Sequence, residues 1–274
     1  MEKKKTKIKL LAIQMSSEIG QINNNIEKVE KLLDLSLSKQ LADFVFLPEA
    51  WTVGWDCNSF PYCAEELENS KSIDMLKNIA KKYYTNIIGG SIIEKKSNGE
   101  LSNTCPVINK KGELVCTYEK NHLFSYYGSN EGNYIKAGEN PVIVTLDGIK
   151  IGLSICYDIR FPELYRAYRK AGADILVNMA AWGANKKIPW DSMTTSRAVE
   201  NQTYFVALTQ TGKLLDGENL GHSMILNYNG EILSEINKIE GGIYATIDLN
   251  DMYDFREKCT ILNDIKSSYE VIIK

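Results

Sequence analysis

Apolar positions along the chain follow two different spacings, and the spacing changes several times between the two ends. Residues 7–15 (KIKLLAIQM) form a short apolar run of the kind found in a buried strand. In residues 22–39 the apolar positions instead recur every three or four residues, which predicts a helix. Asparagines 23–25 offer an N-cap for that helix, and an apolar run at 42–49 (ADFVFLPE) predicts a second strand. The chain therefore opens with a strand, a helix and a strand.

The same alternation continues along the chain, with glycine-containing turns between several neighbouring strands. Lys111-Gly112, Asp147-Gly148 and Asn229-Gly230 are turn signals that predict three β-hairpins. Strands separated by helices, with hairpins among them, predict an α/β fold whose mixed sheets are covered by helices. The expected elements after residue 49 are helices at 72–84, 161–173 and 191–201, hairpins at 107–120 and 141–158, and strands at 86–93, 174–181, 204–212, 222–235 and 241–249.

Length, composition and charge are those of an ordinary globular protein. The chain has 274 residues, of which 44% are hydrophobic and 24% charged, and we expect one domain over 1–274 with its core at about 7–265. The formal net charge of −3 gives no strong field for nucleic acid or for an anionic membrane. No apolar stretch approaches the roughly 20 residues of a membrane span. Residues 8–15, interrupted by Lys9 and Gln14, predict a strand rather than a signal peptide.

Cysteine and histidine usage limits the chemistry that the chain can support. The six cysteines are too sparse for a disulfide framework, no CxxC pair occurs, and only two histidines are present. A structural zinc site is therefore not expected. These features predict a cytoplasmic protein with reduced thiols that needs neither a metal nor an organic cofactor.

Three reactive side chains stand where predicted strands end. Glu49 follows VFLP, Lys120 follows VCTYE and Cys156 follows GLSI, and in folds of this kind functional groups gather at strand ends. A thiol with a free pKa of about 8.5 needs a neighbouring base to attack an amide carbonyl, and a carboxylate can act as that base. A lysine and a backbone N–H, here that of Tyr157, can stabilise the resulting oxyanion. Together these groups suffice for acyl transfer without histidine or metal.

Other interpretations of these residues remain open at this point. Cys156 could be an inert core thiol, as we interpret the other five cysteines. His122 could complete a Cys–His pair, although we expect it to order the loop after Lys120. His222 beside Ser223 is not predicted to form a serine hydrolase site, because the sequence contains no GxSxG motif.

Three sequence blocks around these residues carry a resemblance to a known family. LPEAW around Glu49, YEKNHLF around Lys120 and SICYDIRFPELYR around Cys156 resemble the signature blocks of the nitrilase superfamily of carbon–nitrogen hydrolases. GSIIE, AGEN, SRAVENQTYFVA and GHSMILNYNGEIL agree in order, so the resemblance covers roughly residues 7–265. It implies a four-layer αββα sandwich with Glu49 as general base, Lys120 stabilising tetrahedral intermediates and Cys156 forming a thioester. It also implies a second glutamate beside the lysine, at Glu131.

The segment CYDIRFPE after the nucleophile is similar to that of amidases and omega-amidases. This similarity implies that Arg160 contacts a substrate carboxylate and that Trp182 shapes the pocket. A structural ion pair of Arg160 with Asp158 or Glu163 is the alternative. Lys186-Lys187 stand where the omega-amidases have small hydroxyl residues.

The resemblance implies an amidase that releases ammonia from a small ω-amide of a carboxylic or keto acid. Its partners would be the amide substrate, water and a second copy of the chain in a homodimer, with no nucleic acid and no membrane. The alternatives are an N-carbamoyl amidase, a nitrilase proper, and a catalytically silent binding protein of the same fold.

Overall fold

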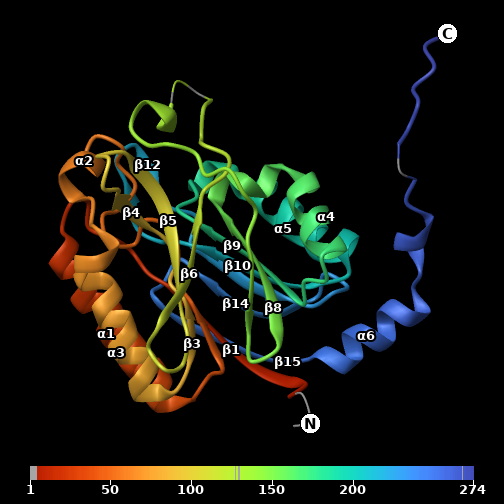
Figure 1. Ribbon diagram of the computed structural model, residues 1–274, viewed down its shortest axis with the longest axis horizontal. Helices are drawn as coiled ribbons and strands as arrows, with labels where there is room; N and C mark the ends of the chain where they lie inside the picture. The colour runs from red at the N-terminus through yellow and green to blue at the C-terminus, as the bar shows by residue number, and fades with distance from the viewer. Residues whose placement is uncertain (1–4, 127, 129, 267) are drawn as a thin grey trace.

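Two β-sheets pack face to face at the centre of the structure, and helices cover the outer face of each sheet (Figure 1). Helices α1 (Ile22–Lys39) and α3 (Lys71–Tyr83) lie against the first sheet. Helices α4 (Pro162–Lys170) and α5 (Lys187–Asn201) lie against the second. This is the four-layer αββα order that the family resemblance implied.

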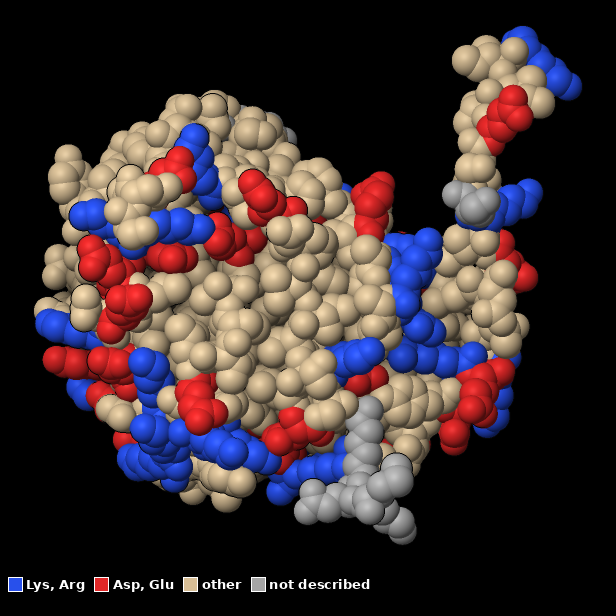
Figure 2. Space-filling view, viewed as in Figure 1, with Lys and Arg blue, Asp and Glu red and all other residues tan. Residues whose placement is uncertain are grey.

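The computed structural model describes residues 5–126, 128, 130–266 and 268–274. No helix within these residues has both the length and the apolar character needed to cross a membrane. Lysines and arginines are interspersed with acidic residues on the face shown in Figure 2, and the middle of that face is largely uncharged. The mixture of charges on this face is in keeping with the small net charge of the sequence.

The first sheet has seven strands in the order β15-β1-β2-β3-β5-β4, with β6 paired to β5. It is mixed, because β1 runs parallel to β2 and antiparallel to β15. Its strands are β1 (Lys7–Gln14), β2 (Phe44–Phe46), β3 (Asn86–Ile88), β4 (Ile92–Lys95), β5 (Leu101–Ile108), β6 (Leu114–Glu119) and β15 (Gly241–Asp248).

The second sheet has six strands in the order β14-β13-β10-β9-β8-β7. Strand β9 lies parallel to both β8 and β10, whereas the outer pairs are antiparallel. Its strands are β7 (Ile143–Leu146), β8 (Ile149–Ile155), β9 (Ile175–Ala180), β10 (Tyr204–Thr209), β13 (His222–Leu226) and β14 (Ile232–Asn237).

The remaining elements connect the strands and helices of these four layers. Two are α-helices, two form a small hairpin, and five are 3₁₀ turns. They are α2 (Phe60–Cys63), α6 (Leu249–Lys258), β11 (Lys213–Leu214), β12 (Gly217–Glu218), η1 (Leu67–Asn69), η2 (Glu131–Asn133), η3 (Cys156–Arg160), η4 (Ala184–Lys186) and η5 (Ile261–Asp264).

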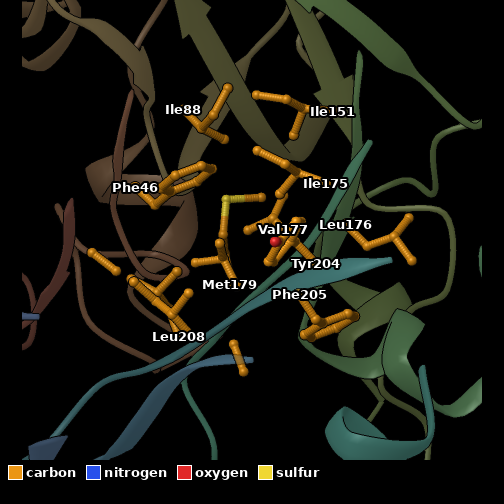
Figure 3. Packing of buried hydrophobic residues seen from close by; sticks show 14 of the residues in the cluster. Phe46, Ile88, Ile151, Ile175, Leu176, Val177, Met179, Tyr204, Phe205 and Leu208 are labelled. Carbon is orange, nitrogen blue, oxygen red and sulfur yellow. The ribbon is translucent and has the colours of Figure 1, made fainter. Parts of the chain in front are cut away.

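The main core lies between the two sheets. Figure 3 shows Val177 and Met179 of β9 pointing toward Phe46 and Ile88 of the first sheet, while Leu176 points to the opposite side. Successive side chains of a strand alternate between its faces, so a strand covered on both faces is largely apolar. All six residues of β9 are buried, and five of them are apolar. The exception is Asn178, whose amide donates to Ser154 and Tyr165.

Most elements expected from the sequence are present. Helix α1 occupies the predicted range 22–39, and the three predicted turns join antiparallel strands. Asp147 and Gly148 have φ angles of 51° and 78°, and positive φ at both central residues is what a type I′ hairpin turn requires. The predicted helix at 191–201 begins earlier, at Lys187, and α6 was not predicted.

The predicted N-cap of α1 is wrong. The capping position is Gln21, and no side chain caps the helix. Asn25 instead lies inside the first turns of α1, where its amide binds the backbone of Glu18 and the carbonyl of Thr52. A buried asparagine with three such bonds fixes the chain that leads out of β1, and this use of the side chain replaces capping.

The prediction of one strand at 86–93 is also wrong, because Gly89-Gly90 divides it into β3 and β4. Gly90 has a φ of +65°, and a Cβ there would lie 2.1 Å from the carbonyl oxygen of Pro48. Only glycine permits this conformation and this close approach. The break therefore lets the chain pass directly against the segment that carries Glu49.

Candidate active site

Side chains from the ends of three strands meet in one buried cluster. Glu49 lies just after β2, Lys120 directly after β6, and Cys156 directly after β8. The Nζ of Lys120 is 2.8 Å from Oε1 of Glu49, and both charged groups lie near enough to the Cys156 thiol to influence its pKa. The structure thus brings together the carboxylate, ammonium and sulfur that the sequence analysis singled out.

The Glu49 carboxylate is fully buried, and both of its oxygens are held in place. Oε1 accepts the bond from Lys120 and a second one from Asn103 Nδ2 at 3.0 Å, while Oε2 accepts the backbone N–H of Ala181 at 2.8 Å. Gln210 Nε2 donates to the Glu49 carbonyl oxygen at 2.7 Å. Ala181 and Gln210 directly follow β9 and β10, so the second sheet fixes a carboxylate that the first sheet carries.

Lys120 is buried between two carboxylates. Its Nζ lies 2.9 Å and 3.1 Å from the two oxygens of Glu131, which also accepts the Phe124 N–H at 2.7 Å. Burial disfavours the ammonium, but the charges of Glu131 and Glu49 outweigh it and hold the pKa of Lys120 well above its usual range. Lys120 is therefore a fixed cation next to Cys156.

Cys156 begins η3 in a strained backbone conformation. Its φ is +43°, in the left-handed region that residues with a Cβ adopt rarely and that is often found at functional sites. Burial first, and then the charge of Glu49, raise the pKa of the thiol well above its usual range, while Lys120 acts in the opposite direction. The resting sulfur is thus a protonated thiol that needs its neighbouring carboxylate to become a nucleophile.

Asn103 is a further member of the cluster that the sequence analysis missed. Its Nδ2 lies 3.0 Å from Glu49 Oε1 and 3.5 Å from Glu131 Oε1, and its backbone carbonyl accepts the Lys120 N–H at 2.9 Å. One residue of β5 therefore contacts all three charged groups. The signal in the sequence was an asparagine at a strand position, where this residue type is depleted.

Asp158 was considered only as a partner for Arg160, but it joins the two segments that carry the lysine and the cysteine. Its fully buried carboxylate accepts the N–H of Ile155 at 2.8 Å and the N–H of His122 at 2.9 Å. It also binds the Tyr118 hydroxyl at 2.6 Å and Nδ1 of His122 at 2.7 Å. His122 thus orders the loop after the lysine, as predicted, and its ring nitrogen faces Asp158 rather than the nucleophile.

A small pocket opens onto the sulfur of Cys156. It encloses about 40 Å³, which is room for only a few non-hydrogen atoms in its inner part. Its lining is aromatic and cationic, with no Asp or Glu among the described residues. The lining residues are Trp55, Phe124, Tyr126, Cys156, Tyr157, Arg160, Ala181, Trp182, Gly183 and Lys186.

Arg160 and Trp182 both lie in this pocket, where the sequence analysis placed them. Arg160 donates a hydrogen bond to the Tyr126 hydroxyl, and its guanidinium lies 5.1 Å from the ring of Trp182. Within the described residues it forms no ion pair with Asp158 or Glu163, so the structural alternative for Arg160 is not observed. Tyr157 follows the cysteine in the first turn of η3, where backbone N–H groups have no helical acceptor.

The cluster can carry out acyl transfer with protein groups alone. It supplies a thiol, a carboxylate near that thiol, and a fixed cation that can stabilise an oxyanion. In the part of the chain that the structure describes, no group of three or more His, Cys, Asp or Glu side chains is arranged as a metal site.

Comparison with known proteins agrees with this chemistry. The profile of the carbon-nitrogen hydrolase family matches residues 9–257. The 2-oxoglutaramate amidase of Bacillus subtilis (strain 168) is 35% identical over 254 residues, which cover 93% of this chain and 96% of that protein. The chloroplastic omega-amidase of Arabidopsis thaliana is 35% identical over 235 residues, which cover 82% of this chain and 63% of that protein.

Among solved structures, Saccharomyces cerevisiae Nit3, a member of branch 10 of the nitrilase superfamily, has a TM-score of 0.86 and 27% identity. The match covers 93% of this chain and 94% of that one, which confirms the predicted αββα fold. The resemblance read from the three sequence blocks is confirmed as well. The chain belongs to the carbon–nitrogen hydrolase family of enzymes, which cleave C–N bonds through a cysteine thioester.

Proposed function

We propose that this hydrolase is an amidase that releases ammonia from a small ω-amide of a carboxylic or keto acid. The observation that carries the proposal is the cluster of the Cys156 thiol, the Glu49 carboxylate and the Lys120 ammonium beside a small cationic pocket that Cys156 lines. Two relatives are named 2-oxoglutaramate amidase and omega-amidase, which supports the same substrate class.

In the proposed reaction Glu49 takes the proton of Cys156 as the sulfur attacks the amide carbon. The oxyanion that forms is stabilised by Lys120 and by the Tyr157 N–H. Collapse of this intermediate breaks the C–N bond, the nitrogen leaves as ammonia with the proton from Glu49, and the acyl group remains on sulfur as a thioester. Glu49 then removes a proton from water, which attacks the thioester, releases the acid and restores the thiol.

Glu131 has a positioning role in this scheme. It holds Lys120 with both carboxylate oxygens, and Phe124 holds one of those oxygens in turn. Because burial alone would favour a neutral amine, a second carboxylate keeps the ammonium charged through the cycle, including the step in which Glu49 carries a proton. The loss of Glu131 should therefore lower kcat more than it changes KM.

We assign the binding of the substrate carboxylate to Arg160, and Trp182 lines the same pocket beside it. The arginine reaches the pocket without an ion-pair partner among the described residues, which supports its role as an anion binder. We further infer a cytoplasmic enzyme that acts as a homodimer on small amides. All six cysteines are free thiols in the structure, which fits a reducing compartment.

A panel of amides, nitriles and N-carbamoyl compounds, with ammonia as the common product, tests the proposal. We expect release from ω-amides by the wild-type protein and none from the Cys156→Ala variant. Ammonia from nitriles or N-carbamoyl compounds but not from amides would instead identify one of the alternative activities. A protein without turnover whose Cys156 also resists an iodoacetamide-type probe would be the silent binding protein.

A further inference from the structure

The pocket contains a second cation that the proposed reaction does not use. We propose that Lys186 and Arg160 together bind the remote carboxylate of the substrate, which makes Lys186 a specificity-determining residue that selects anionic amides. The inference rests on the proposed amidase function and extends it to the means of substrate selection.

The two cations approach the same aromatic side chain. The guanidinium of Arg160 lies 5.1 Å from the centre of the Tyr126 ring, and the ammonium of Lys186 lies 5.9 Å from the same centre. Lys186 also lies 4.8 Å from the ring centre of Phe124. Aromatic rings attract such cations through cation–π interactions. These interactions supply no negative charge, so the charges of Lys186 and Arg160 are not neutralised by the rings.

The backbone that carries Lys186 is held by hydrogen bonds on both sides of the residue. Lys186 is the last residue of η4, its N–H binds the carbonyl of Gly183 at 3.0 Å, and its own carbonyl accepts the indole N–H of Trp182 at 2.8 Å. Trp182 therefore shapes the pocket in two ways, as a wall beside Arg160 and as the anchor of the neighbouring lysine.

The positive charge of this pocket is uncompensated by the protein. Within the described residues neither Lys186 nor Arg160 has an acidic partner, and the buried Nε of Arg160 has no hydrogen-bond partner at all. Burial lowers the pKa of Lys186, Cys156 acts in the opposite direction, and the nearby Arg160 adds a smaller lowering effect. Such an arrangement is unfavourable when empty and is stabilised when an anion lies between the two charges.

A carboxylate fits this arrangement because its two oxygens can accept from a guanidinium and an ammonium at once. With the carboxylate held there, the short pocket places the amide end of the same molecule at Cys156. A neutral amide would leave both cations unpaired, and a cationic amide would be repelled. The preferred class is therefore the monoamide of a short dicarboxylic acid.

The test compares glutaramate with butyramide, in which a hydrogen atom replaces the carboxylate and the three-carbon chain on the amide carbon is kept. In the Lys186→Met variant, whose side chain can still pack on Phe124, we expect KM for glutaramate to rise about 10- to 100-fold, the range for loss of one charge-assisted hydrogen bond. We expect kcat for glutaramate and both constants for butyramide to change less than about threefold. The matched control is Lys187→Met, since Lys187 pairs with Asp191 outside the pocket.

An unchanged KM for glutaramate in Lys186→Met would overturn the inference. An equal rise in KM for glutaramate and for butyramide would overturn it as well. Wild-type protein that hydrolyses butyramide as well as glutaramate would also overturn it, while leaving the amidase assignment intact. If no amide is hydrolysed, the proposed function fails, and the anion site is still tested by calorimetric titration of the Cys156→Ala variant with glutarate. Lys186→Met in that background should weaken glutarate binding by the same 10- to 100-fold factor, and unchanged binding would refute the site.

Discussion

The left-handed backbone at Cys156 predicts an unusual ranking of two variants. With φ at +43°, any residue that carries a Cβ is strained by about 1–2 kcal/mol relative to glycine. Alanine keeps the Cβ and hence the strain, whereas glycine removes it. Against this gain, the greater conformational freedom of glycine in the unfolded chain lowers the stability of the glycine variant by about 0.4–1 kcal/mol. The Cys156→Gly variant should therefore unfold with a free energy about 0.5–1 kcal/mol higher than that of Cys156→Ala.

Both variants should be inactive, because no other described group in the pocket can form the thioester. Replacing the sulfur by hydrogen in Cys156→Ala removes about one methylene equivalent of burial, so we expect a loss near 1 kcal/mol relative to wild type. In a protein of this size the difference between the two variants corresponds to about 1–3 °C in Tm. Differential scanning calorimetry and an ammonia-release assay on the same preparations measure both quantities.

Cys105→Ala is the matched control for these variants. Cys105 is fully buried in the core between the sheets, so its truncation should lower stability while leaving turnover in place. A glycine variant at position 156 that is less stable than the alanine variant by 1 kcal/mol or more would refute the strain argument. A loss of several kcal/mol in Cys156→Ala would support the inert core thiol instead.

Three further predictions follow from the contacts around the cluster. Asn103→Leu removes the amide that orients Glu49, so kcat/KM should fall about 10- to 100-fold in steady-state assays with little change in KM; unchanged kcat would argue against the contact. Asp158→Asn weakens the bonds to His122 and the chain before Cys156, so urea unfolding should show a loss of about 2–4 kcal/mol; full stability would contradict this. Glu49 raises the pKa of the Cys156 thiol, so in Glu49→Gln the thiolate absorbance should appear at lower pH than in wild type, and a shift to higher pH would reverse the sign of our electrostatics.

Local signals in the sequence were sufficient for much of the fold. The spacing of apolar residues gave the bounds of α1, and the Asp147-Gly148 turn placed the hairpin that leads to Cys156. Both features depend on interactions between residues close in the chain. The failed N-cap at Asn25 shows the limit of such signals, because a contact with Thr52, which belongs to a distant loop, decides what that side chain does.

The same limit explains which members of the site were missed. Glu49, Lys120 and Cys156 could be found because each follows a recognisable strand. Asn103 lies within a strand, and its partner Glu49 is 54 residues away in the sequence. Asp158 is separated from His122 by 36 residues. No periodicity marks such pairs, since only the packing of one sheet on the other, or of one loop on the next, brings them together.

The contacts of Glu49 show why this chemistry requires the complete sandwich. The residue is carried by the first sheet, but one of its carboxylate oxygens and its backbone carbonyl are bound by Ala181 and Gln210, which extend from the second. Cys156, the nucleophile that Glu49 must deprotonate, also belongs to the second sheet's side, because it directly follows strand β8. A small rotation of one sheet on the other would therefore separate base from thiol before it exposed much of the core. Because the inter-sheet core is close-packed and resists such movement, the same side chains that stabilise the fold also hold the reacting groups in register.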